Sequence, residues 1–147
     1  MDGEPVTPGD LQVREILDVD GDIVLFAAST DQPERHLWTY ATGGGLDRVT
    51  TEPGVHAGHR AGGTTIICRQ ALDQPGTTVM VRYASSSACR IASTAQAPRL
   101  DLRAELLRAG ERQIRSALFL PSWHKPGAAP LPVLVDSYGG AAARCYP

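Results

Sequence analysis

DQP at residues 31–33 returns as DQP at residues 73–75, and RVTT at residues 48–51 is echoed by RIAS at residues 90–93. The members of each pair lie 42 residues apart, so two independent anchors share one period. A shared period of this length predicts two copies of one supersecondary unit. The rest of the chain is interpreted outward from this repeat.

Runs rich in β-branched and aromatic residues, bounded by turn residues, predict the strands of each unit. GDIVLF at residues 21–26 matches GTTIIC at residues 63–68, and LWTY at residues 37–40 faces VMVR at residues 79–82. A further strand is expected at residues 13–19, before the first copy. We therefore expect each unit to be a four-stranded antiparallel meander.

The turn after the first expected strand fits this interpretation, because Asp20-Gly21 is typical of a tight hairpin. A period of roughly 40 to 45 residues with four short strands is typical of a β-propeller blade. The alternative is a small β-sandwich with a chance echo. A blade buries its faces against its neighbours, and about three repeats are usually needed for stability. Two blades should therefore need self-association or a complementary chain to cover their exposed faces.

The pattern changes after the second unit. Residues 95–98 form a short polar joint that contains proline, and two more strands are expected at residues 100–107 and 114–120. The turn at residues 109–111 would join them into a hairpin. Good helix formers at residues 103–108 leave one or two helical turns as the alternative.

The last apolar run follows a loop with several prolines at residues 121–132. Val133, Leu134 and Val135 form a continuous apolar run, which is typical of a strand buried on both faces of a parallel sheet. The expected fold class is therefore mainly β, with two four-stranded blades followed by the first strands of an α/β sheet.

Two segments carry a resemblance to a known family: QIRSALFLP at residues 113–121 and LPVLVDSYGG at residues 131–140. Together with the two units they resemble the prolyl oligopeptidase family, in particular its dipeptidyl peptidase IV branch. In that family a β-propeller caps an α/β-hydrolase domain, and a Ser-Asp-His triad cleaves short peptides. The implied domains are a lead-in at residues 1–12, the C-terminal propeller blades at 13–95, and a linker with a truncated start of the hydrolase domain at 96–147.

The resemblance assigns a role to Tyr138, which falls in the turn after the third hydrolase strand. Its hydroxyl would donate into the oxyanion hole, where one preorganised donor lowers the barrier by about 3 to 4 kcal/mol. From the residues alone, the alternative is a tyrosine that caps a strand end, with Gly139 and Gly140 serving the turn. Ala141 stands where the family usually has proline, which favours a frameshifted, truncated or split gene product.

The sequence contains no Gly-x-Ser-x-Gly motif, and the family's nucleophile, acid and histidine would all lie beyond residue 140. We therefore expect a fragment of a serine-type peptidase that is active on peptide substrates only in a complete enzyme, and inactive as an isolated chain. Two alternatives remain: a non-catalytic β-propeller-type interaction module, and a remnant with no activity.

Metal and cofactor chemistry is not predicted. His56 and His59 are candidate metal ligands by spacing, but no Cys or carboxylate lies nearby at ligand spacing, so inter-blade loop positions are the preferred interpretation. Cys68, Cys89 and Cys145 contain no Cys-x-x-Cys motif and are expected to be free thiols, two of them in strands.

Charge and hydropathy restrict the partners. The chain of 147 residues has 14 basic and 16 acidic residues and a net charge of -2, which does not favour binding to nucleic acid or anionic membranes. No apolar run approaches the roughly 18 residues of a membrane helix, and the first residues do not resemble a signal peptide. The expected location is therefore the cytoplasm.

Overall fold

The computed structural model describes residues 3–31, 33–72, 74–96 and 102–136. Strands account for all the regular structure in these residues, and no helix occurs among them. The strands are β1 (Gln12–Asp20), β2 (Ile23–Ser29), β3 (His36–Ala41), β4 (Gly45–Arg48), β5 (Val55–Ala61), β6 (Thr64–Ala71), β7 (Gln74–Arg82), β8 (Ala88–Ile91), β9 (Leu102–Ala109) and β10 (Ile114–Pro121).

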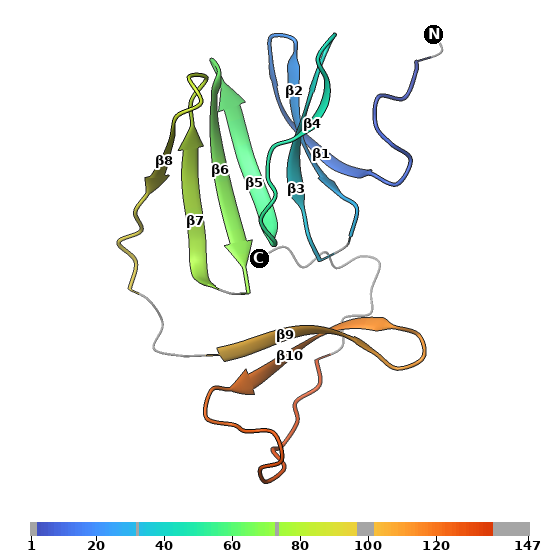
Figure 1. Ribbon diagram of the computed structural model, residues 1–147, viewed down its shortest axis with the longest axis vertical. Helices are drawn as coiled ribbons and strands as arrows, with labels where there is room; N and C mark the ends of the chain where they lie inside the picture. The colour runs from blue at the N-terminus through green and yellow to red at the C-terminus, as the bar shows by residue number, and fades with distance from the viewer. Residues whose placement is uncertain (1–2, 32, 73, 97–101, 137–147) are drawn as a thin grey trace.

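The two repeat units form two separate four-stranded sheets, in the orders β1-β2-β3-β4 and β5-β6-β7-β8. All neighbouring strands are antiparallel, so each unit is the meander that the sequence predicts. Figure 1 shows the β1–β4 sheet beside the β5–β8 sheet, with β5 on the side of its sheet that faces the first. The mainly β fold class is thus confirmed at this level.

Tight turns join the first two strands of each sheet. Asp20 pairs with Ile23 across the turn that begins with Gly21, whose φ is 62°. Ala61 pairs with Thr64 in the second sheet, where Gly62 and Gly63 have φ values of 54° and 75°. Both central residues of the second turn have positive φ, which is the geometry of a type I′ hairpin turn, whereas in the first turn only Gly21 does, as in a type II′ turn. Glycine adopts positive φ without steric cost.

The pairing registers refine the repeat. Trp38 pairs with Phe26 in the first sheet, and Met80 pairs with Ile67 in the second. Trp38 and Met80 are 42 residues apart, as the sequence predicts, but Phe26 and Ile67 are only 41 apart. The predicted match of Phe26 with Cys68 is therefore wrong by one residue, because one more residue separates Ile67 from its partner Met80 than separates Phe26 from Trp38, and the β6–β7 pairing has a register shift between Arg69 and Ala71.

The main core lies between the two sheets. Leu25 and Leu37 of the first sheet are fully buried, and Ile67 of the second is 6% exposed. Side chains that pack around this cluster come from both sheets: Leu17, Val49 and Met80. A second cluster lies on the opposite face of the first sheet and consists of Leu11, Phe26 and Ala28, with Val24, Trp38, Tyr40 and Leu46 packed against it.

Polar contacts also join the sheets at the ends of β1 and β5. Asp18 Oδ2 accepts a hydrogen bond from the backbone N–H of Arg60 at 2.8 Å, and Asp20 Oδ2 accepts one from that of Gly63 at 3.0 Å. The Arg60 guanidinium lies 3.4 Å from the Asp20 carboxylate. These bonds satisfy backbone donors of the second sheet with side chains of the first, so the two sheets are held in one relative position.

Strands β9 and β10 form a separate hairpin with an unbroken register from Leu102–Pro121 to Ala109–Ile114. The expected hairpin is thus confirmed and the helical alternative is wrong, but Ala109, expected in the turn, is the last residue of β9, and residues 100–101 of the first expected strand lie outside the described residues. The turn uses Gly110 at φ 64° and Gln113 at φ 52°. Arg115 forms an ion pair with Asp31, which follows β2. Figure 1 shows the hairpin below the two sheets.

The predicted buried strand at Val133, Leu134 and Val135 is wrong for this structure. These three side chains are 81%, 94% and 80% exposed, and residues 131–136 belong to no strand. A continuous apolar run becomes a buried strand only where neighbouring strands pair with it and other elements cover both faces. No strand among the described residues pairs with this segment.

Candidate functional site

The candidate site lies at the junction of the two sheets, around two histidines. Tyr138, the residue expected to donate into an oxyanion hole, lies outside the described residues, and its role stays a prediction. Both candidate metal ligands, His56 and His59, are described, and the structure separates them. Their surroundings decide what each can do.

His56 and His59 lie on strand β5, so their predicted placement in a loop is wrong. His56 is 2% exposed, whereas the His59 side chain is 81% exposed and lies 3.3 Å from an oxygen of Asp18. Residues three apart on a strand point to opposite faces, so the two rings cannot bind one ion. Among the described residues, no three His, Cys, Asp or Glu side chains are grouped so that they could hold a metal.

The partner of His56 is His36 at the start of β3, a contact that the sequence analysis missed. The two rings are stacked with their centroids 5.1 Å apart and an angle of 29° between their planes. Both residues are buried, at 2% and 3% exposure. The pair brings one strand of each sheet into contact, and residues 20 positions apart give no local sequence signal for it.

Thr50 and Glu34 complete the surroundings of His36. His36 Nε2 lies 2.8 Å from a Glu34 carboxylate oxygen, and Nδ1 lies 3.2 Å from Thr50 Oγ1. Thr50 Oγ1 also accepts a hydrogen bond from the backbone N–H of Leu37 at 3.0 Å. With Nε2–H donating to Glu34, Nδ1 is left to accept from the Thr50 hydroxyl, and every group is satisfied.

The order hydroxyl, imidazole, carboxylate is also that of a hydrolase triad. Here, however, Thr50 is buried, at 6% exposure, and its hydroxyl already accepts a hydrogen bond from a backbone N–H. A nucleophile must reach a substrate carbonyl, and this oxygen is fixed inside the protein. The Thr50–His36–Glu34 network therefore serves to join β3 to the connection between β4 and β5.

Arg35 ties His56 to the first sheet. Its carbonyl accepts hydrogen bonds from the His56 backbone N–H at 2.8 Å and from Nδ1 at 3.0 Å, and its N–H donates to the Gly54 carbonyl at 3.1 Å. Arg35 Nε in turn donates to the His56 carbonyl at 3.1 Å. Burial lowers the pKa of His56, and the hydrogen bond to Arg35 opposes that shift. The ring is therefore neutral near pH 7.

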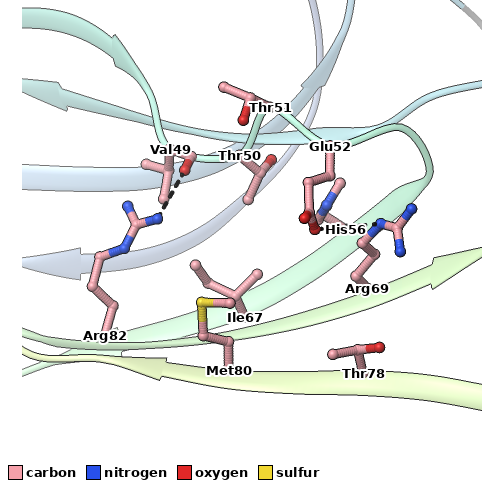
Figure 2. Close-up of a pocket in the computed structure, with 10 residues that line it drawn as sticks. All are labelled: Val49, Thr50, Thr51, Glu52, His56, Ile67, Arg69, Thr78, Met80 and Arg82. Atoms are coloured by element: carbon pink, nitrogen blue, oxygen red, sulfur yellow. Dashed lines mark hydrogen bonds and ion pairs between the residues drawn. The ribbon is translucent and has the colours of Figure 1, made fainter. Parts of the chain in front are cut away.

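A pocket of about 220 Å³ opens beside His56. Figure 2 shows Ile67 and Met80 between its two arginines, Arg82 and Arg69, with Thr50 across from them. The lining residues are Val49, Thr50, Thr51, Glu52, His56, Ile67, Arg69, Thr78, Met80 and Arg82. The pocket thus lies between the inner face of the second sheet and the segment that connects the sheets.

Both arginines of the pocket bond to that connecting segment. Arg69 Nε donates to the Pro53 carbonyl at 2.8 Å and lies 3.7 Å from the Glu52 carboxylate. Arg82 donates to the Val49 carbonyl at 3.4 Å (Figure 2). These contacts fasten the connection between β4 and β5 to the second sheet. The described contacts of the junction therefore hold the two sheets and their connection together.

The comparisons with known proteins concern the fold. No protein-family model matches the sequence, and no curated protein matches it. The structure is similar to the crystal structure of Porphyromonas gingivalis dipeptidyl peptidase 4, with a TM-score of 0.59 and 13% sequence identity. The match covers 80% of this chain and 18% of the other, so this chain spans less than a fifth of that protein.

The similarity at 13% identity is a similarity of fold.

Among the described residues, no helix is long and apolar enough to cross a membrane.

Proposed function

We propose that this chain is part of a serine-type peptidase of the dipeptidyl peptidase kind, to which it contributes two β-propeller blades and the linker toward the catalytic domain. The observation that carries this proposal is how the sheets stack. The face with Leu25 and Leu37 on the first sheet packs against the face with Ile67 and Met80 on the second. Since Met80 corresponds to Trp38, the two sheets use opposite faces for one contact.

This kind of contact repeats in one direction. A sheet that presents one face to the next unit and the opposite face to the previous unit can be followed by further units, as propeller blades are. A symmetric sandwich would instead bring equivalent faces together. The structural similarity to a dipeptidyl peptidase 4 over 80% of the chain supports the same interpretation.

Within such an enzyme, residues 96–147 would lead from the last blade into the hydrolase domain, and Tyr138 would donate to the oxyanion. The apolar residues at 133–135 would become a buried strand once the rest of that domain supplied its neighbours. The isolated chain, without nucleophile, acid and catalytic histidine in its sequence, should not hydrolyse peptides.

The isolated chain is tested with chromogenic Gly-Pro and Ala-Pro dipeptide substrates. We expect no turnover above a blank. Turnover that a serine-directed phosphonate abolishes would contradict the expected inactivity of this chain.

The peptidase assignment itself is tested by reading the adjacent coding sequence in all frames for a Gly-x-Ser-x-Gly segment followed by an acid and a histidine. The encoded polypeptide is then joined to this chain and assayed. In that enzyme, Tyr138→Phe should lower kcat by about 10²- to 10³-fold with little change in KM, as loss of one oxyanion donor does. If no such polypeptide is encoded, or the joined protein is inactive, the assignment fails.

A non-catalytic interaction module is the second candidate, and a specific observation favours it. Apolar side chains remain exposed on the outer face of the second sheet, including Ile66 at 41% and Ile91 at 53%. Such a face fits an interaction surface whether or not a catalytic domain follows. The joined-enzyme assay separates the two candidates, because only the peptidase gains activity.

A further inference from the structure

The contact between the two sheets is made largely by one strand of the second sheet, β5. His56 stacks on His36, and the Arg60 guanidinium lies 3.4 Å from Asp20. Gly58 faces Leu37 so closely that a Cβ at this glycine would lie 2.7 Å from Leu37 Cδ1. Alternate residues of β5 therefore point into the contact, as expected for one face of a strand.

The corresponding strand of the first sheet is β1, and the pairing registers show which residues correspond. Gly58 pairs with Ile67, and Ile16 pairs with Phe26, which is the equivalent of Ile67. The same comparison along the two strands gives three corresponding pairs: His56 with Val13, Gly58 with Ile16, and Arg60 with Val19.

All three β1 residues are exposed and apolar. Val13 is 46% exposed, Ile16 is 66% exposed and Val19 is 69% exposed. They stand where the second sheet has the residues that touch its neighbour. A solvent-facing strand does not need three β-branched apolar side chains on its contact positions, and burying each would contribute roughly 1.5 to 3 kcal/mol.

The second sheet has the matching receiving face. Leu25 and Leu37, which receive β5, correspond to Ile66 and Val79. Antiparallel partners lie on the same face of a sheet, and the registers place the following residues together on this outer face: Ile66, Cys68, Val79, Val81, Cys89 and Ile91. These six side chains are apolar or thiols, and the exposed ring of His59, which pairs with Ile66, lies beside them on the same face.

The residue types at the inner contact differ from those at the corresponding positions of the two outer faces. Where one outer face differs, the other differs in a matching way. Inside the molecule, Arg60 pairs with Asp20. The corresponding outer positions are Val19 on β1 and Ala61 on β5, so an ion pair is replaced by an apolar pair. If only one member of the pair were apolar, the other would bury an unpaired charge beside an apolar side chain, which is unfavourable.

The contact at Gly58 shows the same pattern. The large Leu37 faces a glycine inside the molecule, whereas the smaller Val79 would face Ile16 between the outer faces. These outer faces are thus built to meet each other.

We infer that this chain associates with further copies of itself head to tail, with β1 of one copy docked on the outer face of the β5–β8 sheet of the next. We expect the two copies to be placed relative to each other as the first and second sheets are placed within one chain. The association is heterologous, so it continues beyond a dimer to a ring or a filament. It goes beyond the proposed function and needs no peptidase activity, because it rests on the faces of the two sheets.

Two variants with one blocked face each provide a decisive experiment. Ile16→Asp places a charge on the docking strand β1, and Ile66→Asp places one on the receiving face. Analytical ultracentrifugation of the parent chain at micromolar and higher concentrations should show a mass that rises with concentration. Each variant alone should sediment as a monomer, since one of its two faces is blocked.

Mixing the variants restores one good pair of faces. Ile66→Asp still offers its β1, and Ile16→Asp still offers its second sheet, so an equimolar mixture should form a dimer and nothing larger. Ile114→Asp is the matched control, because Ile114 is a 59% exposed isoleucine on β10, away from both faces. It should associate as the parent does.

Three outcomes would overturn the inference. If the parent chain stays monomeric at all concentrations, copies of this chain do not cover the two faces. Association of Ile16→Asp alone, with Ile66→Asp monomeric, indicates contact between two second sheets. A mixture that remains monomeric, although circular dichroism shows both variants folded as the parent, excludes the head-to-tail contact.

Discussion

Gly58 makes room for Leu37 at the contact between the sheets. A Cβ there would lie 2.5 Å from the Ile66 carbonyl oxygen and 2.7 Å from Leu37 Cδ1, and both neighbours are fixed by packing. The role of this glycine is therefore spatial, since its φ is not among the positive ones. The corresponding position of the first sheet, Ile16, has a large side chain because no neighbour approaches it in the chain itself.

Gly58→Ala should therefore lower the free energy of unfolding, by about 1 to 3 kcal/mol, as overpacking of a core does. The measurement is urea denaturation followed by circular dichroism. Gly9→Ala is the control, because a Cβ at Gly9 meets nothing within 4 Å. Equal stability of the two variants would show that the sheets can separate at Gly58 without cost.

His56 couples stability to pH. Burial lowers its pKa below the ordinary value of about 6.5, which it keeps in the unfolded chain. Below pH 6.5 the unfolded chain therefore binds more protons than the folded chain, and the free energy of unfolding falls as the pH falls. Neighbouring His36 and Arg69 lower this pKa further, while the Arg35 carbonyl and Glu52 raise it.

His56→Asn should reduce the loss of stability between about pH 6.5 and pH 5, because asparagine can bond to Arg35 O but does not titrate in this range. Denaturation curves at several pH values provide the measurement. His59→Asn, on the exposed side of the same strand, is the matched control and should keep the acid sensitivity of the parent. If both variants keep it, another group is responsible.

At the scale of elements, the β9–β10 hairpin stands apart from the two sheets. Its exposed apolar side chains include Leu106 at 59% and Phe119 at 53%, and its ion pair from Arg115 to Asp31 is partly exposed. An isolated two-stranded hairpin is only marginally stable in water, and an exposed ion pair adds at most about 1 kcal/mol.

Hydrogen exchange should therefore be much faster for backbone amides of β9 and β10 than for those of β2 and β6, because the hairpin opens locally while the sheets stay closed. Mass spectrometry of peptic fragments can measure both. Arg115→Ala should speed exchange in the hairpin only. Equal protection of hairpin and sheets would show that the hairpin is packed more firmly than its exposure indicates.

At the scale of the whole molecule, the two sheets should unfold together. The core of Leu25, Leu37 and Ile67 belongs to both sheets, and Asp18 and Asp20 bond across the junction. Separation would expose this core and leave buried polar groups unpaired. Cooperative unfolding of both sheets is the consequence.

Trp38 makes this testable, because the chain has two tryptophans and Trp123 lies outside both sheets. In a Trp123→Phe variant, fluorescence reports on the first sheet, and hydrogen exchange of the β6 and β7 amides at increasing denaturant concentration reports on the second. The two denaturation curves should coincide. Separate midpoints would indicate that the sheets unfold independently.

Local sequence signals predicted most of the elements. Turn glycines such as Gly21 and β-branched runs act over a few residues, so the meanders and the β9–β10 hairpin could be predicted without knowing their neighbours. The run at 133–135 could not, because burial of a strand depends on what pairs with it. The placement of the histidines could not be predicted for a related reason, because the stacking of His56 on His36 requires two sheets in contact.

The sequence by itself determined the repeat, the strand order within each unit and the tight turns, because these depend on local conformational preference and on alternation along one strand. Only the tertiary structure decided the one-residue slip between Phe26 and Ile67, and with it which face of each sheet is buried. A slip of one residue moves every side chain of a strand to the other face. For that physical reason, the contact strand β1 and the receiving face of the second sheet become visible only once the registers are known.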